Sequence, residues 1–203
     1  MKTLVADIGG TNSRLAVAIT SKKNRKIILE NIQKFKNSDF NNFEEVIEKY
    51  LSSSNDNFIS RVCIAAAGII SEDTVEMSNL NWKITVSSLQ KASNIKSVLI
   101  INDLQAQGYA LDFIKPKDLE KLIEGNYSAA QIDTKLVCGM GTGFNVAIAY
   151  QTAFGTFVPA SEYGHARTTT ANEKQKLIVK QLEESSSFVS YENILAGSGL
   201  NRL

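Results

Sequence analysis

Two glycine-rich segments, far apart in the chain, could bind phosphate groups. The first spans residues 4–18, where an apolar stretch containing Asp7 leads to Gly9-Gly10-Thr11-Asn12 and a second apolar stretch. Alternation with period two after the glycines predicts a strand–turn–strand hairpin rather than a strand–loop–helix nucleotide motif. The N–H groups of such a turn can hold phosphate oxygens, and Asp7 could bind Mg²⁺ directly or through water. Taken alone, the segment fits equally well a tight hairpin whose glycines serve only the turn geometry.

The second segment, residues 135–150, repeats this pattern of strand, turn and strand. Its turn is Gly141-Thr142-Gly143, between two runs of apolar residues. Two such hairpins in one chain favour a duplicated phosphate clamp, with one hairpin from each of two lobes.

Four further segments carry a resemblance to a known family. They read Met-Ser-Asn-Leu-Asn-Trp at 77–82, Ile-Asn-Asp-Leu-Gln-Ala at 101–106, Ser-Glu-Tyr-Gly-His at 161–165 and Tyr-Glu-Asn-Ile-Leu-Ala-Gly-Ser-Gly at 191–199. With both hairpins, the chain resembles the hexokinase–actin–Hsp70 superfold and, more closely, bacterial glucokinases of the hexokinase-like type. The resemblance runs from about residue 4 to the last residue. It implies an α/β, ribonuclease H-like fold of the actin/hexokinase type, with two lobes of which the second is incomplete.

The resemblance also implies an activity, ATP-dependent phosphorylation of glucose at the 6-hydroxyl, and a role for particular residues. Asp103 is implied as the catalytic base, and Asn102 as a ligand of the neighbouring sugar hydroxyls. The implied sugar-binding residues are Asn79, Asn102, Asp103, Glu162, His165 and Glu192. The implied ATP-binding residues are Asp7, Gly9, Gly10, Thr11, Asn12, Gly141, Thr142 and Gly143, with Asp7 also placed to bind Mg²⁺.

The residue types support these roles but leave alternatives open. Asn102 and Asp103 follow an apolar run at the carboxyl end of an expected strand, where open α/β sheets bind ligands. The same pair could cap the helix expected to begin at Leu104, and capping is compatible with catalysis. A lone histidine is more often structural than a ligand, but the Glu-x-x-His turn of Glu162 and His165 matches the sugar-binding turn of the family, so the resemblance favours sugar binding. A catalytic serine motif and a cysteine cluster for zinc are both absent from the sequence.

Three residues depart from the pattern of these glucokinases. Asn145 stands where they usually have glycine, and we expect it to narrow the second phosphate turn. Tyr163 replaces a small residue beside Glu162, which adds bulk and a hydroxyl to the sugar pocket. Ser198 takes the place of a proline in the last motif.

Composition and net charge limit the classes of partner that the protein is expected to bind. The 203 residues are 43% hydrophobic and 21% charged, with a formal net charge of +1, which argues against nucleic acid or an anionic membrane as the main partner. The N-terminal apolar run is interrupted by Asp7 and the glycines, unlike a signal peptide. Cys63 and Cys138 fall in expected buried strands and are interpreted as core residues in a reducing compartment. We therefore expect a cytoplasmic protein that binds a hexose, glucose first, and MgATP; a homodimer is left open.

Periodicity predicts the elements that position these residues. A helix over 43–51 is indicated by apolar residues on one face, with Asn41 or Asn42 as its cap. Strands are expected at 26–33, 61–66, 97–101 and 155–160, a short helix capped by Thr85 or Ser87, and a further helix near 177–182. We expect a small N-terminal α/β lobe at residues 1–103 and a partial large lobe at 104–203.

The C-terminal residues 200–203 resemble the first turn of a helix, and a single turn is unstable alone. Because the resembling glucokinases continue through a segment that holds adenine, we expect this chain to be truncated. The alternatives are a kinase for a different hexose and a non-catalytic sugar-binding or regulatory remnant. An actin- or Hsp70-like ATPase is disfavoured, because neither needs the Glu-x-x-His turn.

Overall fold

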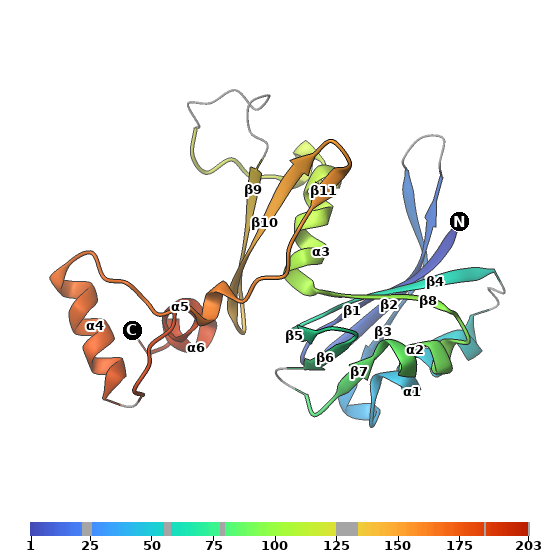
Figure 1. Cartoon of the computed structure of the whole chain (residues 1–203), viewed down its shortest axis with the longest axis horizontal. Helices are drawn as coiled ribbons and strands as arrows, with labels where there is room; N and C mark the ends of the chain where they lie inside the picture. Colours follow the sequence, from blue (N-terminus) through green and yellow to red (C-terminus); the bar gives the residue numbers. More distant parts are fainter. Residues whose placement is uncertain (22–25, 55–57, 78–79, 125–133, 185, 203) are drawn as a thin grey trace. The chain divides into compact units, whose positions relative to one another are not determined.

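A five-stranded mixed sheet, in the order β3-β2-β1-β4-β8, forms the centre of the first part of the chain (Figure 1). Its strands are β1 (Lys2–Ile8), β2 (Asn12–Thr20), β3 (Ile27–Lys36), β4 (Ile59–Ala66) and β8 (Ser97–Asn102). β1 and β2 form the expected antiparallel hairpin, and β1, β4 and β8 run parallel. The carboxyl ends of these three strands therefore lie at one edge of the sheet.

The structure is a computed structural model that describes residues 1–21, 26–54, 58–77, 80–124, 134–184 and 186–202. The chain divides into two compact units, Met1–Asp103 (unit 1) and Leu104–Leu203 (unit 2), and each is described by itself. Within the described ranges, no helix is long and apolar enough to cross a membrane.

Two helices, α1 (Phe43–Ser53) and α2 (Val86–Ser93), pack against each other in unit 1. Asn42 caps α1 by accepting a hydrogen bond from the Glu45 N–H at 3.0 Å, and Thr85 caps α2 through a capping box with Ser88. The apolar face predicted for the first helix is buried in a large core shared with the sheet. That core includes Leu4, Ile8, Leu15, Val17, Phe43, Val46, Ile47, Tyr50, Val62, Ile64, Trp82 and Leu89.

A second, three-stranded antiparallel sheet in unit 1 was not predicted from the sequence. It consists of β5 (Gly68–Ser71), β6 (Thr74–Met77) and β7 (Lys83–Thr85). Strands of three or four residues are too short to give a clear alternation, which is why the pattern did not indicate them. Val75 and Ile84 of this sheet are fully buried in the core of unit 1.

Unit 2 contains the second hairpin, in an antiparallel sheet of order β11-β10-β9. The strands are β9 (Thr134–Met140), β10 (Phe144–Thr152) and β11 (Gly155–Phe157), and the chain enters the unit through α3 (Asp103–Ala110). A small core between α3 and one face of this sheet contains Leu104, Ala147, Ala149 and Val158. Three further helices follow: α4 (Glu173–Glu183), α5 (Tyr191–Leu195) and α6 (Gly197–Leu200).

The interpretation of Cys138 as a core residue is wrong. Cys138 lies in β9, as expected, but is exposed, and its neighbours on the same face, Leu136 and Met140, are 59% and 60% exposed. The apolar run suggested burial on both faces, whereas among the described residues only the α3 face of this strand is covered. Cys63, in β4, is partly buried, and burial raises the pKa of its thiol.

Asp112 joins the segment after α3 to all three strands of the unit 2 sheet. Its carboxylate pairs with Lys135 of β9 and accepts hydrogen bonds from Gln151 Nε2 at 2.7 Å and Thr156 Oγ1 at 2.8 Å. The hydrogen bonds from Lys135, Thr156 and Gln151 lower the pKa of Asp112 to about 2.

Candidate active site

The first of the two turns expected to bind phosphate (the first phosphate turn) connects β1 to β2 at the edge of the unit 1 sheet. The Gly9 N–H donates to the Asn12 carbonyl at 3.1 Å, which closes the turn. Asp7, on β1, is exposed and lies opposite Arg14 on β2, with its Oδ2 3.2 Å from Arg14 Nη1. The carboxylate expected to bind Mg²⁺ is therefore accessible beside the turn, next to a guanidinium group.

Asn37, which the sequence analysis did not single out, braces this turn. It is 2% exposed; its Nδ2 donates to the Gly9 carbonyl at 2.8 Å and its backbone N–H to the Thr11 carbonyl at 3.0 Å. Its Oδ1 accepts a hydrogen bond from the buried Ser13 hydroxyl at 2.8 Å. Asn37 thus fixes the turn from outside the hairpin. Its only signal in the sequence is an Asn-Ser-Asp run after a strand, which is typical of an ordinary loop.

The Asn102–Asp103 pair lies at the same sheet edge as the first turn. Ile8, which precedes the turn, is in register with Ala66 of β4, and Ala66 is in register with Asn102 of β8. At about 4.8 Å between neighbouring strands, Asn102 is roughly 10 Å from the end of β1. Parallel pairing therefore brings the turn and the expected base region together within unit 1.

Asn102 is buried, and its Nδ2 donates to the Gly68 carbonyl of β5 at 3.3 Å. Asp103 is the first residue of α3, so this helix begins one residue earlier than expected. A carboxylate in the first turn of a helix is stabilised by the positive end of the helix dipole. Asn79, the remaining expected sugar ligand before residue 104, lies outside the described residues.

The second phosphate turn is held by the last helices of unit 2. The Gly141 N–H donates to the Gly143 carbonyl at 2.9 Å, and the Gly197 N–H of α6 donates to the Gly141 carbonyl at 2.8 Å. Glu192 of α5 accepts a hydrogen bond from the Phe144 N–H, immediately after the turn, at 3.0 Å. A Cβ atom at Gly143 would lie 2.7 Å from Glu192 Oε2, so glycine allows this carboxylate to approach the turn.

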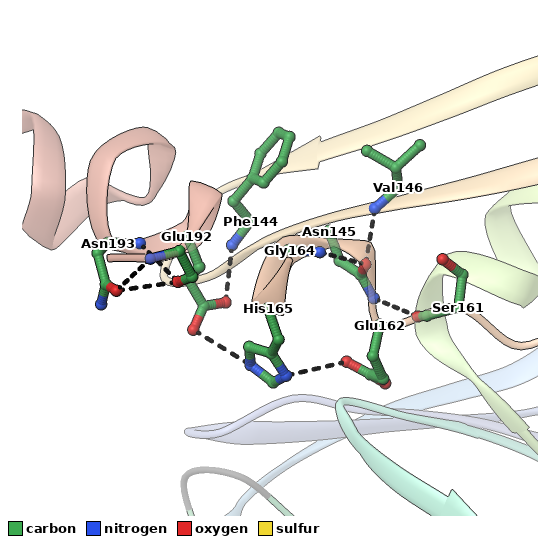
Figure 2. Close-up of polar contacts among 10 residues, drawn as sticks. Phe144, Asn145, Val146, Ser161, Glu162, Gly164, His165, Glu192 and Asn193 are labelled. Carbon is green, nitrogen blue, oxygen red and sulfur yellow. Dashed lines mark hydrogen bonds and ion pairs between the residues drawn. The ribbon is translucent and has the colours of Figure 1, made fainter. Parts of the chain in front are cut away.

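His165 lies between two carboxylates (Figure 2). Its Nδ1 is 3.9 Å from Glu162 Oε2, and its Nε2 is 3.7 Å from Glu192 Oε1. These distances are longer than hydrogen bonds, and each becomes an ion pair only when the imidazole is protonated. The three side chains are 37–55% exposed, so they present carboxylate acceptors and an imidazole to solvent side by side.

This arrangement suits a ligand with several adjacent hydroxyl groups. A carboxylate accepts hydrogen bonds from two hydroxyls at once, and an imidazole can either donate or accept one. Because the gaps beside His165 exceed hydrogen-bond length, a ligand hydroxyl can enter between the imidazole and either carboxylate without breaking a hydrogen bond between them. Unit 2 thus brings together Glu162, His165 and Glu192, three of the six residues that the sequence analysis placed at the sugar.

Tyr163, which was expected to add bulk beside Glu162, stacks on Tyr191. Their ring centroids are 5.5 Å apart with an interplanar angle of 18°, and the Tyr191 hydroxyl lies 2.8 Å from Thr169 Oγ1. The hydrogen bond with Thr169 lowers the pKa of Tyr191, while the neighbouring Tyr191 hydroxyl raises the pKa of Tyr163. The stack connects the Glu162 turn to the first residue of α5, which is the residue before Glu192.

Asn145, which we expected to narrow the second phosphate turn, has its side chain engaged elsewhere. Its Nδ2 donates to the Ser161 carbonyl at 2.6 Å, and its Oδ1 accepts from the Gly164 N–H at 3.2 Å. Figure 2 shows this amide directed toward the segment that carries Glu162.

The mixed sheet with a turn at its carboxyl edge and the hairpin of unit 2 define a sugar kinase fold of the actin/hexokinase type. A glucokinase from an Antarctic psychrotroph superposes with a TM-score of 0.80 at 29% identity, over 98% of this chain and 62% of that one. The glucokinase family model matches residues 4–203, and the chain belongs to the glucokinase family.

Two further comparisons agree. The glucokinase of Colwellia psychrerythraea is 33% identical over 201 residues, which cover 98% of this chain and 59% of the relative. A glucokinase from Balamuthia mandrillaris, solved in complex with glucose, superposes with a TM-score of 0.73 at 23% identity, over 98% of this chain and 60% of that one; it supports the fold. The chain spans 58–59% of the length of the first curated relatives that it matches.

Proposed function

We propose that this chain provides the hexose-binding and phosphate-binding groups of an enzyme that phosphorylates glucose at its 6-hydroxyl with ATP. The observation that carries the proposal is the grouping of Glu162, His165 and Glu192, with the imidazole 3.7–3.9 Å from both carboxylates. Family membership and the glucose complex of the Balamuthia mandrillaris glucokinase support glucose as the sugar.

Asp103 is proposed as the general base for the attacking hydroxyl, and Asn102 as a ligand of an adjacent hydroxyl. A carboxylate accepts the proton of an attacking hydroxyl in sugar and protein kinases alike, while the remaining catalysis is positioning and charge stabilisation. The placement of Asp103 at the carboxyl edge of the sheet, the edge that also bears the first phosphate turn, supports this role.

The two glycine turns are proposed to hold the phosphates of ATP through their backbone N–H groups. Asp7 fits a magnesium ion that arrives with the nucleotide, because Mg²⁺ is usually held by one or two carboxylates together with substrate phosphates. Among the described residues, no cluster of three or more His, Cys, Asp or Glu side chains could form a complete protein cage. Mg²⁺ bound there would neutralise phosphate charge during transfer.

The test is a substitution of Asp103, compared with the unaltered protein and with a matched control. Asp103→Asn keeps the shape of the side chain but removes the base, so kcat should fall at least ~10²-fold while the Kd for glucose changes little. The matched control is Asp118→Asn, which removes an exposed carboxylate from the 3₁₀ turn Pro116–Asp118. A near-normal kcat in Asp103→Asn, measured by coupled ADP release, would contradict the assignment of the base.

A further inference from the structure

We propose that Asn145 is a positioning residue that fixes the Glu162–His165 turn to β10, directly after the second phosphate turn. The inference rests on the proposed function of these residues in hexose binding. Asn145 is the second residue of β10, two residues after Gly143, and its side chain crosses to a segment sixteen to nineteen residues further along the chain.

The side-chain amide uses both its donor and its acceptor. Nδ2 donates to the Ser161 carbonyl at 2.6 Å; Oδ1 accepts from the Gly164 N–H at 3.2 Å and from the Val146 N–H at 2.8 Å. Ser161 precedes Glu162, and Gly164 precedes His165. The backbone is therefore held on both sides of Glu162, in the way Figure 2 shows.

Few side chains could replace this amide. Aspartate has two acceptors and would place a charged oxygen against the Ser161 carbonyl, and serine is too short to bridge the two backbone groups. Gly164 is packed as closely as the backbone permits, since a Cβ there would lie 1.8 Å from the Phe144 carbonyl oxygen. The turn and β10 thus contact each other backbone to backbone at Gly164, and the Asn145 side chain supplies hydrogen bonds between them.

Neighbouring residues of β10 consequently set the two carboxylates beside His165. Phe144 binds Glu192 directly through its N–H, at 3.0 Å, and Asn145 holds the turn that carries Glu162. Loss of the Asn145 amide removes two links between β10 and the turn that carries Glu162, and leaves the contact of Glu192 with Phe144 in place. The spacing around His165 is then no longer fixed, and hexose affinity falls although every sugar-contacting side chain remains.

The experiment compares three variants of the 203-residue chain by NMR. Asn145→Asp and Asn145→Ser both remove the bridging amide. Serine adds no charge, so the second variant carries less risk to folding than the first. The control is Gln151→Ala, which removes an amide of the same strand that bonds to Asp112 and Thr156 at the opposite end of β10. Amide exchange of Gly164 and the imidazole shift of His165, the only histidine, are measured before and after glucose is added.

Asn145→Ser should speed Gly164 exchange by at least ~10-fold, whereas Asn145→Asp keeps an acceptor for this N–H and loses only the donor to Ser161. Both variants should move the His165 signals and weaken glucose affinity by about 10-fold. Gln151→Ala should leave all three unchanged. Unaltered Gly164 exchange in Asn145→Ser, or unaltered His165 signals and glucose affinity in both variants, overturns the proposal. If the wild-type chain fails to bind glucose, the proposed function is contradicted, and the role of Asn145 in hexose binding fails with it. Gly164 exchange in Asn145→Ser still reports separately whether Asn145 holds the turn.

Discussion

The two phosphate hairpins have the same local design but are held by different parts of the molecule. The first lies on a large core, and its turn is held by a neutral group, the buried amide of Asn37, which accepts a hydrogen bond from the Ser13 hydroxyl. The second lies on a small core between α3 and one sheet face, and its turn is fastened by the Glu192 carboxylate and the N-terminus of α6. The motif therefore specifies the turn, while residues distant in sequence determine how firmly it is held.

The largest expected difference between the hairpins is in their cores. Leu4→Ala, in the large core, should lower the free energy of unfolding by about 4 kcal/mol, and Leu104→Ala, in the small core, by about 2 kcal/mol. Urea unfolding followed by the fluorescence of Trp82, which lies in the unit 1 core, measures the first change; amide exchange along β10 measures the second. Equal losses of unfolding free energy would show that the two cores stabilise their hairpins equally, which would contradict the comparison.

A smaller effect is expected at the brace of the first turn. Asn37→Ala leaves the Gly9 carbonyl and the buried Ser13 hydroxyl without this partner, so unit 1 should lose about 1–3 kcal/mol of stability. Asn41→Ala is the control, because this asparagine is exposed and its Nδ2 donates only an exposed hydrogen bond, to Glu45 at 3.0 Å, so stability should change by less than about 1 kcal/mol. If Asn37→Ala loses no more stability than its control in the same urea titration, Asn37 does not stabilise the first turn.

Part of the fold could be predicted from the sequence, and part could not. The β1–β2 hairpin, α1 and β8 were predictable, because their apolar periods are regular and their glycines and caps mark the ends. The sheet of β5, β6 and β7 was not, since its strands are too short. Burial of Cys138 was predicted wrongly, because an apolar strand does not reveal whether both of its faces are covered.

The candidate site, too, could be predicted only in part from the sequence. The grouping of Glu162, His165 and Glu192 followed from the family resemblance of their motifs, and the described structure brings these three together. Two other roles could not be assigned from the sequence: that of Asn37, which holds the first phosphate turn, and that of Asn145, which we propose fixes the Glu162–His165 turn. Each bonds to backbone groups of a segment that the fold brings near it, and the residue type alone does not identify that segment.

The smallest effect is a pH dependence that separates the two units. The pKa of Asp112 is about 2 in the folded protein and 3.8 as its ordinary value, so its contribution to unit 2 stability is complete above about pH 4 and is lost as the pH falls through 2. The group is partly exposed, which reduces the effect through solvent screening. In unit 1 the first turn is held by the neutral amide of Asn37, and the Asp7–Arg14 ion pair of the hairpin is exposed, so acid should weaken the second hairpin first.

Thermal unfolding between pH 4 and pH 2 measures this dependence, with amide exchange along β10 and β2 as the reporters for the two hairpins. Asp112→Asn should flatten the pH dependence of β10, and Asp118→Asn should leave it as in the wild type. If β2 loses its protection before β10 on acidification, the contrast between neutral and charged fastenings is wrong.

The central claim is that Glu162, His165 and Glu192 form a hexose-binding arrangement, and a glucose titration of the 203-residue chain tests it most directly. Because the chain has one histidine, a single set of imidazole NMR signals reports on the middle of the arrangement. We expect a saturable shift of the His165 signals with glucose, none with sorbitol, and a strongly weakened response in Glu192→Gln. Signals of His165 that stay unchanged up to high glucose concentrations, in a chain shown to be folded, would contradict the claim.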